Sequence, residues 1–212
     1  VPDGADKVII QEDVQRTGDL ITISDDSDAK SNIRPAGVDF KIGTQMLAPR
    51  RLDPGDVALL ASMNIAQVPV ARAPVVALIS TGDELVMPGE TPSADQIIAS
   101  NTYGLAAMLT AIGAAPRILP IARDSRASLT TAFDLSQGAD LVITIGGASF
   151  GDHDLVAGVA HDLGMEQSFY KVAMRPGKPL MAGRLRGTPM IGLPGNPVSA
   201  MVCGTIFVQP ML

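Results

Sequence analysis

The stretch LVITIGGASFGDHD, residues 141–154, holds the strand, the turn and the helix start that decide the expected fold. Residues 141–145 are all apolar or β-branched, which is typical of a strand buried on both faces. Two glycines follow, and from Leu155 onward the apolar residues recur with helical spacing. A buried strand that passes through a glycine-rich turn into a helix indicates an α/β fold with a parallel sheet.

The turn between this strand and this helix has the composition of an anion site. Its glycines, Gly146, Gly147 and Gly151, leave backbone N–H groups open near the positive end of a helix, where phosphate binds well. Asp152 and Asp154 lie beside them, and two carboxylates suit a phosphate only if a Mg²⁺ ion sits between. The alternative is an ordinary tight turn in which an aspartate caps the helix.

The rest of this half of the chain alternates short apolar segments with helical ones. We expect strands at 75–80, 117–122, 166–174 and 189–193, and helix starts at Ser100-Asn101, Asp124-Ser125 and Asn196-Pro197. Helices of about ten residues between strands predict a doubly wound, mostly parallel sheet with right-handed connections. Ligands bind outside the carboxyl ends of the strands in such a sheet.

Polar residues follow four of these strands and should therefore meet at one edge of the sheet. Glu84 follows the first strand, Asp124 the second, the glycine-rich turn the third, and Asn196 the fourth. Helix capping alone would explain some of these polar residues, but their presence after all four strands favours a functional site at this edge of the sheet.

The stretch KVAMRPGKP, residues 171–179, carries three cations in an otherwise acidic chain. Strand alternation would put Lys171 and Arg175 on one face, and the two prolines would stiffen the following loop that holds Lys178. A solvated edge strand protected by Lys and Pro is the alternative. We favour an anion clamp, because cations of this kind bind oxyanions through charge-assisted hydrogen bonds.

The composition excludes several classes of protein. A net charge of −6 and a pI of about 4.8 argue against a general nucleic-acid binder, and 3% aromatic residues argue against base-stacking platforms. No apolar run approaches the ~18 residues that span a membrane. The single cysteine, Cys203, lies in an apolar helical run that favours a core position, and its lack of a partner fits a cytoplasmic location. Two histidines and one cysteine do not make a zinc site.

In the first part of the chain, the sequence patterns that indicate strands and helices are weaker. We expect short strands at 7–11, 20–23 and 67–71, with a turn at 17–19, and a helix from Asp53-Pro54 to about Met63 that stops at Asn64. Ala73-Pro74 marks the joint to the alternating half. Because the chain opens at Val1 without Met, we expect it to be a piece of a longer protein.

The order of these motifs resembles that of one known family. STGDEL (80–85), SN (100–101), GGASFGDHD (146–154), KVAMRPGKP (171–179) and GLPGNPVSA (192–200) follow one another as in the molybdopterin molybdenumtransferases, the MoeA proteins of bacteria and the E domain of gephyrin. VPDGAD (1–6) and RPAGVDFKIG (34–43) extend the likeness over nearly the whole chain.

The resemblance implies three parts of a larger protein. Residues 1–30 would be a remnant of a small β domain, 31–73 part of an elongated dimerisation domain, and 74–212 the molybdopterin-binding α/β domain. The family's N-terminal part and C-terminal β-barrel would lie outside this fragment. The resemblance also implies a homodimer, with other proteins of molybdenum cofactor biosynthesis as further partners.

The implied reaction is the Mg²⁺-dependent insertion of molybdate into adenylylated molybdopterin, with release of AMP. Motif matching then assigns catalytic roles to Glu84, Asp124, Asp154 and Lys171, and metal binding to Asp152 and Asp154. It assigns substrate binding to Gly146, Gly147, Ser149, Gly151, Arg175, Lys178, Pro194, Asn196 and Pro197. Arg175 departs from the family, where Lys is common, and Val38 stands where the family commonly has Glu.

Two other functions fit parts of the same sequence. A molybdopterin adenylyltransferase of the MogA type would share the α/β half but should lack residues 1–73 and the PGNP helix start. A non-catalytic scaffold or binding module, as in the E domain of gephyrin, would need an exposed apolar groove for a partner peptide, and no residue pattern identifies one.

Overall fold

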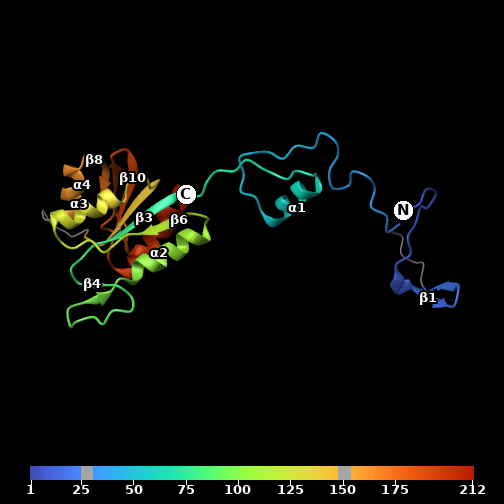
Figure 1. The fold of residues 1–212 in the computed structure, drawn as a ribbon, viewed down its shortest axis with the longest axis horizontal. Helices are drawn as coiled ribbons and strands as arrows, with labels where there is room; N and C mark the ends of the chain where they lie inside the picture. The colour runs from blue at the N-terminus through green and yellow to red at the C-terminus, as the bar shows by residue number, and fades with distance from the viewer. Residues whose placement is uncertain (25–30, 148–153) are drawn as a thin grey trace. The chain divides into compact units, whose positions relative to one another are not determined.

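A computed structural model describes residues 1–24, 31–147 and 154–212 of the chain. These residues divide into two units, Val1–Val70 and Ala71–Leu212, each of which is described by itself (Figure 1). Within the described ranges, no helix combines the length and the apolar character that crossing a bilayer requires.

The first unit begins with a β-hairpin. β1 (Val14–Thr17) pairs antiparallel with β2 (Leu20–Ile23), and the turn between them contains Gly18 at φ +64°. The prediction of β2 is confirmed, but the strand predicted at 7–11 is wrong. The turn at residues 18–19 brings the four residues directly before it opposite β2, and a short 3₁₀ helix, Gln11–Asp13, leads into them.

The helix of the first unit, α1 (Pro54–Ser62), starts and stops as its sequence predicts. Asp53 caps it, accepting a hydrogen bond from the Asp56 amide at 2.8 Å, while the Asp56 carboxylate accepts one from the Asp53 amide at 3.1 Å. Asn64 follows the helix in the left-handed conformation, at φ +62°. The strand predicted at 67–71 is wrong, because no neighbouring strand pairs with this segment in the described chain.

The second unit is built on a six-stranded sheet in the order β6-β3-β7-β10-β9-β8. Its strands are β3 (Val75–Ser80), β6 (Ala115–Ile118), β7 (Leu141–Ile145), β8 (Met165–Tyr170), β9 (Met181–Leu185) and β10 (Thr188–Leu193). β6, β3, β7 and β10 are mutually parallel, and β9 and β8 extend the sheet antiparallel. The predicted α/β class with a mostly parallel sheet is confirmed.

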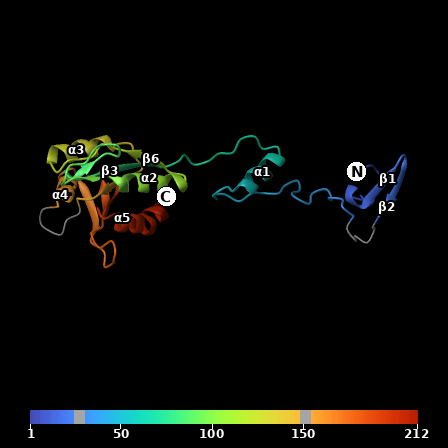
Figure 2. The ribbon, with the colours of Figure 1, turned by 90° about the horizontal axis from the view of Figure 1, so that it is seen from below.

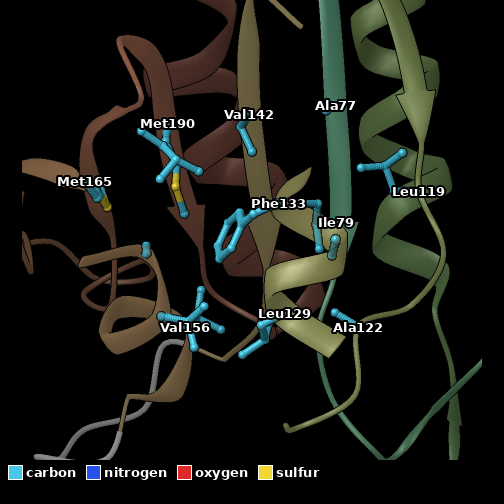
Figure 3. Packing of buried hydrophobic residues seen from close by; sticks show 14 of the residues in the cluster. Ala77, Ile79, Leu119, Ala122, Leu129, Phe133, Val142, Val156, Met165 and Met190 are labelled. Atoms are coloured by element: carbon cyan, nitrogen blue, oxygen red, sulfur yellow. The ribbon is translucent and has the colours of Figure 1, made fainter. Parts of the chain in front are cut away.

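Helices cover both faces of this sheet, with α3 and α5 on opposite sides (Figure 2). The helices are α2 (Ser100–Ala111), α3 (Arg126–Leu135), α4 (Leu155–Asp162) and α5 (Pro197–Cys203). On one face Leu129 and Phe133 of α3 and Val156 of α4 pack over Ile79 and Val142 (Figure 3). On the other face, α2 and α5 pack on those apolar strand residues whose side chains point away from α3 and α4. Two short strands, β4 (Leu85–Val86) and β5 (Ile97–Ile98), form a separate ribbon.

Two strand predictions are wrong in their extent. The strand placed at 117–122 is β6, four residues long, and only Ala122 beyond it makes an isolated bridge, to Thr81. Pro120 lacks the N–H that would continue the ladder. The strand placed at 166–174 ends at Tyr170, because Lys171 takes a left-handed conformation at φ +74°.

Candidate functional site

The carboxyl ends of β3, β7 and β10 are joined side by side, and a pocket opens over them. The Thr81 amide donates to the Ile145 carbonyl and the Gly146 amide to the Leu193 carbonyl, both at 3.0 Å. The pocket has a volume of about 470 Å³. Its lining includes Glu84, the N-terminal turns of α2 and α5, Gly146, and apolar side chains of the β4–β5 ribbon. The structure thus brings together parts of three of the four predicted strand ends.

Glycines allow the chain segments around this pocket to approach closely. Gly146 and Gly147 have φ +90° and +70°, and a Cβ at Gly147 would lie 2.3 Å from Cγ2 of Val156. A Cβ at Gly146 would lie 2.9 Å from the Thr81 carbonyl oxygen, and one at Gly195 would lie 3.4 Å from Cα of Gly146. The turn after β7 therefore lies directly against the ends of its two neighbouring strands.

Asp124, a predicted catalytic residue, makes contacts that hold a neighbouring loop. Its carboxylate accepts from the Asp83 amide at 3.3 Å, and the Asp83 carboxylate accepts from the Asp124 amide at 3.1 Å. The guanidinium of Arg123 donates to the carbonyls of Asp83 and Leu85 at 3.1 and 3.0 Å. Both contacts fix the loop that carries Glu84, and Glu84 lines the pocket whereas Asp124 does not.

Asn101 is a site residue whose role the motif SN did not reveal. We expected Ser100-Asn101 to cap α2, but the N-cap is Ala99, without a side-chain bond, and both residues lie inside the helix. The Asn101 side chain instead donates to the Gly195 carbonyl at 2.7 Å, and both residues line the pocket. Only the sheet topology brings these residues together, so no local signal could have paired them.

The start of α5 is as predicted. Asn196 caps it, accepting from the Ser199 amide at 3.2 Å, and Pro197 occupies the first turn. Asn196 and Pro197 line the pocket, whereas Pro194 is buried and is not among the lining residues.

Asp154 caps α4 and also contacts Tyr170. One carboxylate oxygen accepts from the Ala157 amide and the other from the Tyr170 hydroxyl, both at 2.9 Å. Burial, followed by the bond to Asp154, raises the pKa of Tyr170 to about 12, so the phenol is protonated and donates at neutral pH. The capping interpretation is therefore confirmed for Asp154, and the metal-binding one stays a prediction.

The cationic stretch is a loop and not the expected strand, so strand alternation does not place Lys171 and Arg175 on one face. The loop is closed by backbone bonds from Lys171 to Leu180 and from Val172 to Lys178, at 2.8 and 3.0 Å. The ammonium of Lys171 lies 5.1 Å from the centre of the Tyr170 ring.

This loop rests on α5 through a close contact of small residues. A Cβ at Gly177 would lie 2.5 Å from Sγ of Cys203, whose pKa burial raises. Cys203 is fully buried, which confirms its predicted place in the core.

The remaining predicted site residues, Ser149, Gly151 and Asp152, lie outside the described residues. In the ranges that the structure describes, no group of three His, Cys, Asp or Glu side chains could hold a metal ion. Among the described residues, Glu84 is also the only charged side chain that lines the pocket. The described lining of the pocket therefore carries a single negative charge, and the cations of residues 171–179 lie on the loop after β8, outside that lining.

Comparison with known proteins identifies both units. Residues 77–212 match the family described as "Probable molybdopterin binding domain", and residues 1–64 match the "MoeA N-terminal region (domain I and II)". This chain belongs to the MoeA family. The similar relatives include molybdopterin molybdenumtransferases from Haemophilus influenzae, 39% identical, and from a Nostoc species, 36% identical.

These relatives match the whole of this chain but are about twice as long. The chain covers 53% and 50% of their lengths. Among solved structures, a MoeA protein of molybdopterin biosynthesis from Pyrococcus horikosii has a TM-score of 0.71 and 33% identity. That match covers 97% of this chain and 52% of the other. A molybdenum cofactor biosynthesis protein B, 13% identical with a TM-score of 0.50, shares the fold of the α/β unit.

Proposed function

We propose that the protein to which this chain belongs inserts molybdate into adenylylated molybdopterin and releases AMP, as a molybdopterin molybdenumtransferase. The observation that carries this proposal is the pocket at the carboxyl edge of β3, β7 and β10, in the part of a MoeA-family chain that matches a molybdopterin-binding domain. The match of residues 1–64 to the MoeA N-terminal region favours this reaction over the MogA-type adenylyl transfer.

The two parts of the site suit the two kinds of group in this substrate. The pocket between Glu84 and Asn196 suits an uncharged ring system with hydrogen-bonding edges, because it combines apolar walls with a few polar groups. Lys171, Arg175 and Lys178 bind the oxyanion, either molybdate or a phosphate. Glu84 orients the attacking oxygen, and Asp124 acts through the loop that it holds.

Asp154, together with Asp152, would hold the Mg²⁺ ion that the family implies. The carboxylate of Asp154 fits this use, because each of its oxygens accepts one hydrogen bond and a carboxylate has about four acceptor positions. Magnesium in proteins is commonly bound by one or two carboxylates together with substrate phosphates. When bound, the ion would offset negative charge on the pyrophosphate.

Replacing Asp154 with Asn tests this assignment. Asn caps helices about as well as Asp, so the fold should persist while the carboxylate charge is lost. We expect molybdopterin binding to change little and Mg²⁺-dependent AMP release to fall by about tenfold or more. The matched control is Asp134→Asn, on the surface of α3, where the lost partner is Arg186. Unchanged AMP release from a variant of unchanged thermal stability would contradict the role.

The family resemblance also leads us to propose a homodimer. Light scattering should then give about twice the 22.0 kDa mass of this chain. A mass equal to that of a single chain at micromolar concentration would contradict the proposed dimer and leave the site assignment intact.

A further inference from the structure

One side chain contacts two of the charged groups that we assign to the phosphate end of the substrate. Tyr170 is the last residue of β8, an edge strand, and its half-buried ring packs against the core on the α3–α4 face. Its hydroxyl donates to Asp154 at 2.9 Å, and the ammonium of Lys171 lies 5.1 Å from the centre of its ring.

The contact with Asp154 fixes the direction of the carboxylate. The Ala157 amide holds one oxygen at 2.9 Å and the Tyr170 hydroxyl holds the other at the same distance. The first bond alone would leave the carboxylate free to rotate about the bond that attaches it. With both hydrogen bonds in place, the orientation of the carboxylate is fixed, and so are the directions of its remaining acceptor positions.

The contact with Lys171 fixes the position of a cation. Lys171 has a left-handed backbone, at φ +74°, which turns the chain out of β8, and its amide donates to the Leu180 carbonyl at 2.8 Å. The chain turn and the ring together set where the long side chain lies, because an ammonium over an aromatic face is held by the negative charge of that face.

We propose that Tyr170 is a positioning residue that orients the Asp154 carboxylate through its hydroxyl and places the Lys171 ammonium through its ring. This inference rests on the proposed function, because it takes Asp154 and Lys171 as the groups that meet the substrate's phosphates. The two contacts use different atoms of one side chain, so separate substitutions can remove them one at a time.

The test measures the affinity of the whole chain for inorganic pyrophosphate by calorimetry, with and without Mg²⁺. Tyr170→Phe removes the hydroxyl and keeps the ring. We expect affinity without Mg²⁺ to stay within about twofold of the wild type, and the gain in affinity on adding Mg²⁺ to fall by about tenfold. Tyr170→Leu removes both contacts, and its affinity without Mg²⁺ should fall as well.

Two controls separate positioning from a general effect on folding. Tyr103→Phe changes the other tyrosine of the chain, an exposed residue of α2, and should match the wild type in both measurements. In an Asp154→Asn background, Tyr170→Phe should have no further effect on the Mg²⁺ response, since it acts through that carboxylate.

The outcomes distinguish this inference from the function on which it rests. A wild-type chain whose affinity for pyrophosphate does not respond to Mg²⁺ would overturn the proposed metal role and the inference with it. A wild type that responds, with Tyr170→Phe responding equally, would overturn the inference alone. Equal losses from Tyr170→Phe with and without Asp154→Asn would also overturn it, because the hydroxyl would then act through something other than Asp154.

Discussion

At the scale of single residues, the hydroxyl of Thr144 should weaken the fold. Thr144 lies fully buried in β7, and its hydroxyl has no hydrogen-bond partner among the described residues. Burying an unpaired hydroxyl costs about 1–3 kcal/mol. Thr144→Val keeps the shape of the side chain, so we expect the free energy of unfolding in urea to rise by about 1 kcal/mol.

Thr102→Val is the matched control for this substitution. Thr102 is also buried, but its hydroxyl is bonded to that of Ser80, so its removal leaves a buried partner unpaired. We expect a loss of about 1–3 kcal/mol in the same measurement. Equal losses in the two variants would show that the Thr144 hydroxyl has a partner after all.

The Arg72–Asp140 pair should make the stability of the second unit depend on acid pH. The Asp140 carboxylate accepts from the Arg72 guanidinium at 2.6 Å and from the Val75 amide at 2.7 Å, and these contacts lower the pKa of Asp140 to about 2. A lowered pKa contributes stability above the ordinary value of about 3.9 and loses it as the pH falls toward 2. Asp140→Asn should therefore be less stable at pH 7 and should flatten the decline of the urea midpoint between pH 4 and 2. An unchanged decline would contradict the assignment.

The residues of the site differ in how far the sequence alone could predict them. The cap at Asp154 and the turn at Gly146 depend on neighbours within a few positions, and local patterns predict such contacts. The bond from Tyr170 to Asp154 joins residues 16 positions apart, and that from Asn101 to Gly195 joins residues 94 apart. Such contacts depend on the strand order, which local sequence patterns do not predict.

At the scale of elements, the two glycines Gly147, in the turn after β7, and Gly158, in α4, should respond to alanine in opposite ways. Gly147 has φ +70° and its Cβ would lie 2.3 Å from Val156, so Gly147→Ala should destabilise the chain by about 2 kcal/mol or more. Gly158 is an exposed residue of α4 with open space around its Cβ, so Gly158→Ala should stabilise it by about 0.5–1 kcal/mol. Thermal unfolding of both variants measures this, and a stable Gly147→Ala would show that the turn can shift without strain.

Among the six strands of the main sheet, the one that the sequence failed to predict is β9. Its segment, MAGRL, has a central glycine, and glycine is depleted in strands. In the structure that glycine, Gly183, is required by close packing, because its Cβ would lie 2.4 Å from the Glu166 carbonyl oxygen. Arg186 and Gly187 both have positive φ in the turn to β10, as in a tight hairpin, but Arg is not a usual residue there.

At the scale of the whole molecule, the failure to predict β9 shows which part of the topology the sequence pattern could predict and which it could not. A helix between two strands of one sheet carries the chain back to the edge where the first strand began, so strands such as β3, β6 and β7 run parallel. The alternation of apolar and helical segments in the sequence therefore predicted this part of the sheet. The antiparallel edge of β8 and β9 depends on a hairpin and on a chain turn at Lys171, neither of which has a strong local signal. The pocket lies over the parallel part, so its place in the fold was predicted while the cationic loop beside β8 was not.

The division of the chain into two units leads to a prediction about ligand binding. Every described residue that lines the pocket, and the described contacts that hold Asn101 and the loop of Glu84, belong to Ala71–Leu212. A shortened chain of residues 71–212 should therefore bind molybdopterin with an affinity within about threefold of the full chain, a difference of about 0.7 kcal/mol. The fluorescence of the ligand can report binding without interference from tryptophan, because the chain has no Trp. Residues 1–70 alone should show no binding, and a loss of more than about tenfold in the shortened chain would mean that the first unit contributes directly to the site.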